Sequence, residues 1–179
     1  MKRFLLVLVI LVVVAGTVFA QASHPKGLGI GVLWRSNMVW GGSGFNGNAA
    51  LSLKLPSMPI FWAINFDGGN NYLYIGVSGD NYLMGGHLTS NILFWYLGLG
   101  GYVGLSTWNN QKNNSGDASI SLGARLPVGL SLQLLERILE VFVEIAPSLG
   151  VSFWTSGQGG VHFPDGSLGI AIGLRVWIK

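Results

Sequence analysis

The residues of this chain that could carry chemistry are a few charged side chains, which recur on one face of alternating segments. Lys, Arg, Asp and Glu make up only 9% of the 179 residues, against about 25% in soluble domains. Eight of them share one parity within their segments: Arg35, Lys54, Asp80, Arg125, Glu140, Glu144, Arg175 and Lys179. Buried charges are tolerated when they are paired. The shared face therefore favours ion pairs inside the fold, with a proton or solute path as the alternative.

No catalytic or metal-binding pattern accompanies these charges. His24, His87 and His162 lack the spacing of metal ligands, and the many glycines do not form a phosphate-binding loop. There is no cysteine, hence no disulfide framework and no lipidation site. No nucleophile–base pair or basic patch is evident. The sequence predicts a protein that is not an enzyme, has no cofactor or metal, and does not bind nucleic acid.

The elements that position the charges alternate with a period of two. In residues 166–179, Leu168 and every second residue up to Ile178 are bulky and aliphatic, whereas Arg175 and Trp177 stand among Gly and Ala on the other face. This period is typical of a β-strand. Seven more segments follow the rule: 27–35, 48–55, 59–67, 72–84, 92–107, 118–133 and 139–154. Unbroken parity favours one strand over 72–84, although a turn at 78–81 could make it a hairpin.

The breaks between these segments carry further predictions. Pro127 and Pro147 lack a ladder donor, so we expect a bulge or strand end near each. Residues 134–138 favour a short helical turn. Links 36–47, 108–117 and 155–165 are long and polar, whereas 56–58, 89–90 and 134–138 are shorter. Alternating long and short links are typical of a membrane barrel with extracellular loops and periplasmic turns.

Alternation alone does not say whether the aliphatic face points outward. A soluble lipocalin-like barrel would turn it inward, but the other face, mostly Gly, Ala, Ser and Tyr, is too bare for a surface in water. Trp34, Trp62 and Trp95 lie on the aliphatic face near the predicted strand ends, where interfacial aromatics sit; ordinary core tryptophans are the alternative. We expect an all-β, eight-stranded, antiparallel up-and-down transmembrane β-barrel with the lipid bilayer as its partner.

Inside such a barrel, five of the charges are placed to form a polar network. The segment 139–154 lies between 118–133 and 166–179, so its two glutamates can reach toward an arginine on either side. The predicted lumen network is Asp80, Arg125, Glu140, Glu144 and Arg175. The interior of eight strands is just wide enough for side chains to fill. We therefore expect a filled lumen.

The first residues predict export. Lys2 and Arg3 precede an apolar run over 4–14, and small residues follow up to Ala20, which is typical of a cleaved Sec-type signal peptide. A membrane-spanning helix would need about 20 apolar residues. We expect residues 1–20 to be the signal and 21–179 the barrel domain, with a net charge of only about +1. The expected location is the bacterial outer membrane.

Three segments carry a resemblance to a known family: Gly-Ala-Arg-Leu-Pro-Val-Gly-Leu-Ser at 123–131, and the segments 139–150 and 169–175. They resemble small outer-membrane barrels of spirochaetes, which are similar to outer membrane protein A and its relatives X and W. One departure is the end Trp177-Ile178-Lys179, where such barrels commonly finish on an aromatic residue.

The resemblance implies a surface-exposed structural or adhesin-type protein. Its expected partners are the barrel-assembly machinery and, through the loops, host or extracellular ligands. A narrow porin-like channel for small or hydrophobic solutes is the first alternative. A soluble periplasmic lipocalin-like lipid binder is the second.

Overall fold

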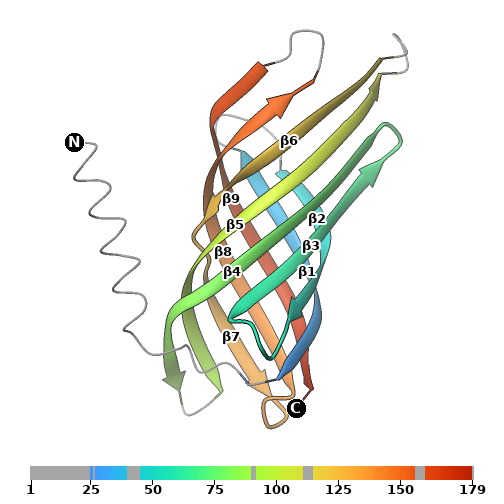
Figure 1. Ribbon diagram of the computed structural model, residues 1–179. Coiled ribbons are helices and arrows are strands. Elements are labelled where there is room, and N and C mark those ends of the chain that lie inside the picture. Colours follow the sequence, from blue (N-terminus) through green and yellow to red (C-terminus); the bar gives the residue numbers. More distant parts are fainter. Residues whose placement is uncertain are drawn as a thin grey trace, which may run out of the picture.

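The described residues form one antiparallel sheet that closes on itself (Figure 1). The computed structural model describes residues 25, 27–39, 45–89, 92–110, 115–155 and 160–178; the predicted signal, residues 1–20, lies outside them. In this part the strands are β1 (Leu28–Val39), β2 (Phe45–Lys54), β3 (Ile60–Gly69), β4 (Tyr72–Thr89), β5 (Leu93–Asn110), β6 (Ser115–Arg125), β7 (Val128–Leu134), β8 (Leu139–Trp154) and β9 (Gly160–Ile178). The same residues contain no helix long and apolar enough to cross a membrane.

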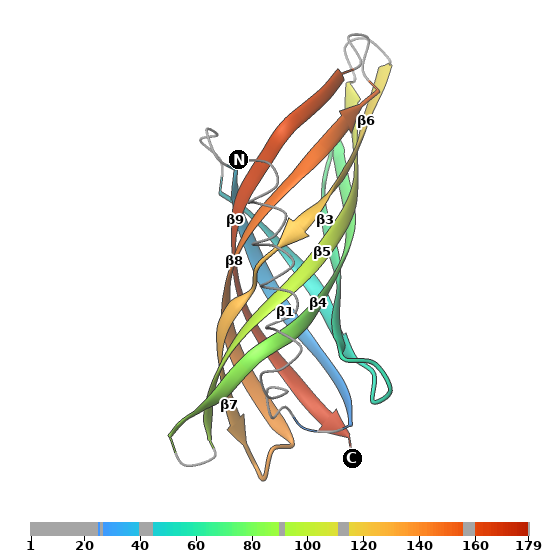
Figure 2. The same ribbon diagram turned by 60° about the vertical axis from the view of Figure 1, so that its left-hand side comes forward.

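The ring has eight positions around its circumference, each of which we call a stave. There are eight and not nine because β6 and β7 are successive parts of one stave. Both pair with β5 and with β8, and the chain steps between them at Leu126 and Pro127 (Figure 2). The ladder continues through the step, since Gly98 N donates to Pro127 O at 2.7 Å and Leu126 N to Pro147 O at 3.0 Å. Pairing of the first strand, β1, with the last, β9, closes the circle. The predicted eight-stranded antiparallel barrel is confirmed, and so is the strand end at Pro127.

Residues 72–84 belong to one strand, so the hairpin alternative is wrong. β4 runs to Thr89, with irregular register between Tyr82 and Met84 and between His87 and Thr89. Ser78, in the middle of the proposed turn, pairs with Ala63 on one side and Tyr102 on the other. Ladder partners on both sides outweigh the local turn preference.

The predicted long links are mostly strand, which corrects the sequence-based boundaries. β1 reaches Val39 and β2 begins at Phe45; β5 reaches Asn110 and β6 begins at Ser115; β9 begins at Gly160. Their Gly, Asn and Ser residues are typical of loops when taken alone, but a neighbouring strand supplies their hydrogen bonds.

The predicted helical turn at 134–138 is also wrong. Leu135, Glu136 and Arg137 have φ of 50°, 56° and 70°, which is the left-handed region and not a right-handed helix. Ile138 N donates to Leu135 O at 3.0 Å. Left-handed residues suit a tight hairpin because their twist matches that of the flanking strands.

The aliphatic face of every stave points outward. Along β9, Ile172, Leu174 and Val176 are exposed, whereas Arg175 and Trp177 are buried inside. β7 repeats the pattern, with Leu130 and Leu132 outside and Ser131 and Gln133 inside. The lipocalin-like alternative required the opposite arrangement and is contradicted.

Candidate functional site

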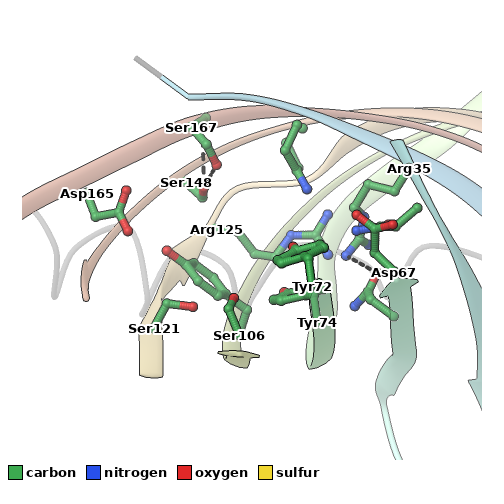
Figure 3. A pocket seen from close by; sticks show the side chains of 16 residues that line it. Arg35, Asp67, Tyr72, Tyr74, Ser106, Ser121, Arg125, Ser148, Asp165 and Ser167 are labelled. Carbon is green, nitrogen blue, oxygen red and sulfur yellow. Dashed lines mark hydrogen bonds between the residues drawn. The ribbon is translucent and has the colours of Figure 1, made fainter. Parts of the chain in front are cut away.

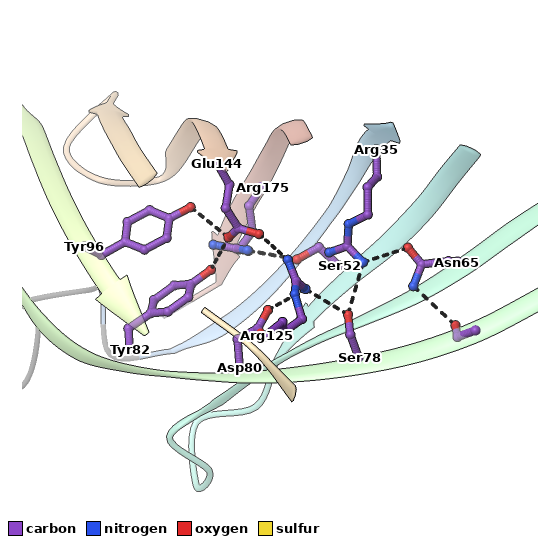
Figure 4. A network of polar contacts seen from close by, with 11 residues as sticks. Arg35, Ser52, Asn65, Ser78, Asp80, Tyr82, Tyr96, Arg125, Glu144 and Arg175 are labelled. Carbon is purple, nitrogen blue, oxygen red and sulfur yellow. Dashed lines mark hydrogen bonds and ion pairs between the residues drawn. The ribbon is translucent and has the colours of Figure 1, made fainter. Parts of the chain in front are cut away.

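The middle of the lumen is crossed by a network centred on Arg125 of β6 (Figure 4). Its Nη1 donates to Asp80 Oδ2 at 2.9 Å and to Ser78 Oγ at 3.2 Å, and its Nη2 donates to Glu144 Oε1 at 2.6 Å. The hydroxyls of Tyr82 and Tyr96 donate to Glu144 Oε2 at 3.4 and 3.1 Å. Both carboxylates of this level are therefore engaged by one guanidinium.

A second cluster surrounds Arg175 of β9. Its Nη1 donates to Glu140 Oε2 at 2.8 Å, and its Nε and Nη2 donate to Ser52 Oγ at 3.2 and 2.9 Å. The guanidinium lies 4.8 and 4.7 Å from the ring centroids of Phe61 and Phe142. Glu140 also accepts hydrogen bonds from Ser131 Oγ and Trp177 Nε1, both at 2.7 Å.

Aromatic rings fill the lumen beside these charges. Tyr82 is stacked between Phe61 and Tyr96, with centroid distances of 4.2 Å on both sides, and Trp177 meets the edge of Phe61 at 6.2 Å. All four side chains are buried. Phe61, Tyr96 and Trp177 stand near the ends of β3, β5 and β9 that share one half of the barrel with the turn 135–138. We call this half, which holds the C-terminal end of β9 in Figure 1, the closed end. The other end, where β5 meets β6 and β8 meets β9, is the open end.

The open half of the lumen holds a cavity of about 210 Å³, which we call the lumen cavity (Figure 3). Its lining includes Arg35, Asp67, Tyr74, Tyr102, Arg125 and Asp165. Two tyrosines lie flat against glycines: a Cβ at Gly123 would come within 2.8 Å of the Tyr102 ring, and one at Gly104 within 2.7 Å of the Tyr74 ring. These glycines let the rings lie against the wall, which leaves the space open.

The five predicted network residues all lie inside the barrel, but they form two clusters. Asp80, Arg125 and Glu144 meet at mid-lumen, and Glu140 and Arg175 meet nearer the closed end. Sequence reasoning expected tyrosines around the charges but did not say which neutral side chains would bind them: Ser52, Asn65, Ser78, Tyr82, Tyr96 and Ser131. Their inward parity was readable, but nothing in the sequence said which staves bring them together. In the described part of the chain, no group of acidic or histidine side chains is arranged to hold a metal ion.

The three predicted interfacial tryptophans lie on the aliphatic face, each close to a glycine of the next strand. A Cβ atom added to Gly47 would lie 2.8 Å from the Trp34 ring. One added to Gly79 would lie 3.0 Å from the Trp62 ring, and one added to Gly86 would lie 3.3 Å from Trp95 Nε1. Trp62 and Trp95 stand near the starts of β3 and β5. Trp34 is further from a strand end than its predicted strand implied, because β1 continues to Val39.

Comparison with known proteins adds a family and a fold. A family model described as "Protein of unknown function (DUF3996)" matches residues 58–173. The chain is similar to the crystal structure of Neisserial surface protein A, with a TM-score of 0.51 and 15% identity over 84% of this chain and 96% of that chain. It is also similar to a major outer membrane protein from Thermus thermophilus, with a TM-score of 0.47 and 12% identity over 84% and 99% of the two chains. No curated protein sequence matches. The first likeness supports the fold of an outer-membrane β-barrel.

Proposed function

The chain belongs to the DUF3996 family of proteins of unknown function, and we propose that it is an integral outer-membrane protein with a closed lumen. In this proposal it works at the cell surface, as a structural or adhesin-type protein, and not as a pore. Export by a Sec-type signal, insertion by the barrel-assembly machinery and kinship with spirochaetal barrels stay predictions.

The observation that carries the proposal is the distribution of side chains between the two faces. Val32, Leu51 and Ile172 are 58%, 52% and 54% exposed on three different staves, while the charges of the lumen are buried and paired. Soluble monomers rarely expose apolar patches beyond a few hundred Å². An outward apolar band around a polar interior is the arrangement of membrane barrels.

The filled lumen favours a surface role over the porin-like alternative. A solute passing the middle would have to separate Arg125 from Asp80 and Glu144, and then displace the stacked rings of Phe61, Tyr82 and Tyr96. Breaking a buried ion pair costs about 3–5 kcal/mol, so spontaneous opening is rare.

The open end supports contact with partners outside the cell. Trp108 packs against Tyr72 and Trp154, with ring centroids 5.5 and 5.1 Å away. On β9, Val161 and Phe163 are 66% and 70% exposed. Exposed apolar side chains in a group mark interaction sites, and we assign this end to the exterior.

Two measurements on the purified protein test the proposal. The protein is expected to need detergent and to migrate faster on a gel when it is not boiled, because a closed barrel stays folded. In planar lipid bilayers it is expected to give no steady conductance. A protein that is monomeric without detergent contradicts membrane insertion, and a steady ion current contradicts the closed lumen.

Epitope insertion tests the orientation. A short tag between Asn110 and Ser115 is expected to be labelled by antibody on intact cells. The matched control carries the same tag between Glu136 and Arg137, in the closed-end turn, and is expected to be labelled only after the outer membrane is opened. The reverse pattern would place the open end in the periplasm.

A further inference from the structure

Arg35 differs from the other two buried arginines of the lumen in its partners. It is 8% exposed and lines the lumen cavity. Its Nη1 donates to Asn65 Oδ1 at 3.1 Å and to Ser78 Oγ at 3.3 Å, both neutral acceptors. Its Nε is buried without a hydrogen-bond partner. Among the described residues, Arg125 and Arg175 each hold a carboxylate within 2.9 Å, whereas Arg35 holds none.

Two of the lumen carboxylates whose charge acts on Arg35 are already bound to another arginine. Asp80 and Glu144 both bind Arg125, so each contributes to Arg35 only through the longer-range field. A guanidinium presents its donors in a rigid fork that matches a carboxylate or phosphate. Arg35 is thus a buried guanidinium in the wall of the lumen cavity that can bind an anion.

The wall across the cavity has the opposite preference. Asp165 lies on the far side from Arg35 in Figure 3, where it accepts a hydrogen bond from Ser152. The rings of Tyr74 and Tyr102 also line the cavity, whereas Asp67 is drawn on the same side as Arg35 in Figure 3. Carboxylates beside tyrosine rings attract ammonium groups, because the ring faces are negative.

The volume of the cavity limits its occupant to a small molecule. Because the lumen is blocked below the cavity, that molecule has to enter and leave by the open end. Its volume of about 210 Å³ is smaller than the ~300–1,000 Å³ of pockets that take drug-sized ligands. Below it the lumen is blocked by the Arg125 network and the stacked aromatic rings.

We propose that the lumen cavity binds a small amino-acid-like zwitterion, with its carboxylate on Arg35 and its ammonium group facing Asp165 and Tyr102. A simple anion would meet the two aspartates, and a simple cation would meet Arg35. A molecule that carries both charges satisfies both walls. This inference rests on the proposed closed lumen and deepens it, since it gives the open end of that lumen a ligand.

Matched probes test the requirement for two charges. Glycine, β-alanine, 4-aminobutyrate and 6-aminohexanoate are titrated into the full-length protein in detergent, with binding followed by calorimetry. One spacing is expected to bind best, and at least tenfold more tightly than the fatty acid and the alkylamine of the same chain length. If the acid or the amine binds equally well, or if no amino acid of the series saturates the protein, the inference is overturned.

Variants test which residue binds the carboxylate of the ligand and which binds its ammonium group. Arg35→Gln is expected to weaken binding of the best probe at least tenfold. Asp165→Asn is expected to weaken it similarly, while binding of the matched fatty acid is unchanged or tighter because a repelling carboxylate is removed. Arg137→Gln, in the closed-end turn, is the control and should bind as the unmodified protein does. The unboiled gel shift identifies any variant that fails to fold. Should Arg35→Gln be lost in this way, unchanged affinity in Asp165→Asn still overturns the proposal.

Conductance separates this inference from the proposed function. If the probe binds and also carries current across a bilayer, the closed lumen fails and the zwitterion site stands. If there is neither binding nor conductance, the zwitterion site fails and the closed lumen stands.

Discussion

Glu144 joins an arginine and two tyrosines at the middle of the lumen. It accepts hydrogen bonds from Arg125, Tyr82 and Tyr96, so Glu144→Ala removes one of the two carboxylates that bind the buried Arg125 guanidinium and an acceptor of two buried hydroxyls. Breaking a buried pair costs about 3–5 kcal/mol, and we expect the free energy of unfolding to fall by that amount. Urea unfolding in lipid vesicles, followed by tryptophan fluorescence, measures it.

The control for this variant is Glu136→Ala, in the exposed turn between β7 and β8. Surface substitutions usually change stability by less than about 0.5 kcal/mol. If the two variants were equally stable, the mid-lumen network would contribute nothing to folding.

Arg175 tests whether geometry matters as well as charge. Its guanidinium donates to Glu140 and, through two nitrogens, to Ser52, while it lies against the rings of Phe61 and Phe142. Lysine keeps the charge but lacks the planar fork. We expect Arg175→Lys to lower the free energy of unfolding by about 1.5–3 kcal/mol, the value of one hydrogen bond to a charged group.

Arg137→Lys is the matched substitution outside the lumen, since Arg137 contacts only the face of Phe94, at 5.7 Å, among the contacts known for it. It should be nearly neutral in the same unfolding assay. Equal losses in both variants would mean that the ring-lined site at Arg175 has no geometric requirement.

At the residue scale, the sequence locates the charges but not their partners. Arg and Lys facing lipid at mid-depth would cost about 2–4 kcal/mol, so shared parity was enough to place Arg125 and Arg175 inside. The contact of Arg35 with Asn65 and Ser78 joins three staves. Neutral side chains show no charge pattern in the sequence. The register between the strands, which decides which side chains meet across the lumen, is fixed only when the ring closes.

The apolar band can be tested on one strand, because β9 carries exposed aliphatic residues at very different depths. Ile172 lies in the alternating part of β9, and Val161 lies at the open-end start of the strand, where residues 160–164 are all exposed. Arginine on the lipid face costs about 2–4 kcal/mol at the bilayer midplane and about 0–1 near the interfaces. We therefore expect Ile172→Arg to destabilise the barrel strongly and Val161→Arg to have little effect.

Refolding into vesicles under graded urea measures both variants of β9. The pair is internally controlled, since the strand and the introduced residue are the same and the main difference is depth. If both arginines were tolerated equally, the aliphatic face would be in contact with water and the membrane proposal would fail.

At the element scale, alternation predicted the interior of each strand better than its ends. The run 139–154 matches β8 residue for residue, because its inside–outside pattern persists to both ends. β1 and β9 extend beyond their predicted bounds, since polar and glycine residues join a ladder once a neighbour offers hydrogen bonds. The same prediction of a bulge or strand end was confirmed at Pro127, where the missing ladder donor coincides with a strand end. At Pro147 the strand does not end: β8 runs through this residue, which pairs with Leu168, and the nearest irregular register is between Gly150 and Ser152.

On the scale of the whole molecule, closure of the ring lets a sheet with an apolar outer face lie in lipid without an unpaired edge. A sheet with free edges would leave backbone groups unpaired in lipid, where they cannot bind water. The seam between β1 and β9, the first and last strands, removes those edges, and its ladder runs from Leu28 opposite Ile178 to Val39 opposite Ser167. The charged side chains inside the closed ring can then find their hydrogen-bond partners in one another, without contact with lipid.

The seam can be tested by cross-linking, because the chain has no cysteine of its own. Val32 of β1 is directly opposite Leu174 of β9, and Leu174 is opposite Val141 of β8. Directly opposed Cα atoms are about 4.5–5.5 Å apart, within the range that a disulfide spans. Val32→Cys with Leu174→Cys is expected to cross-link under mild oxidation, which appears as a mobility change on a boiled, non-reducing gel. Val32→Cys with Val141→Cys is the control: these positions are two strand spacings apart, about 9.6 Å, and should stay reduced. A barrel open at this seam would leave both pairs unlinked, so the difference between the pairs decides whether the ring is closed.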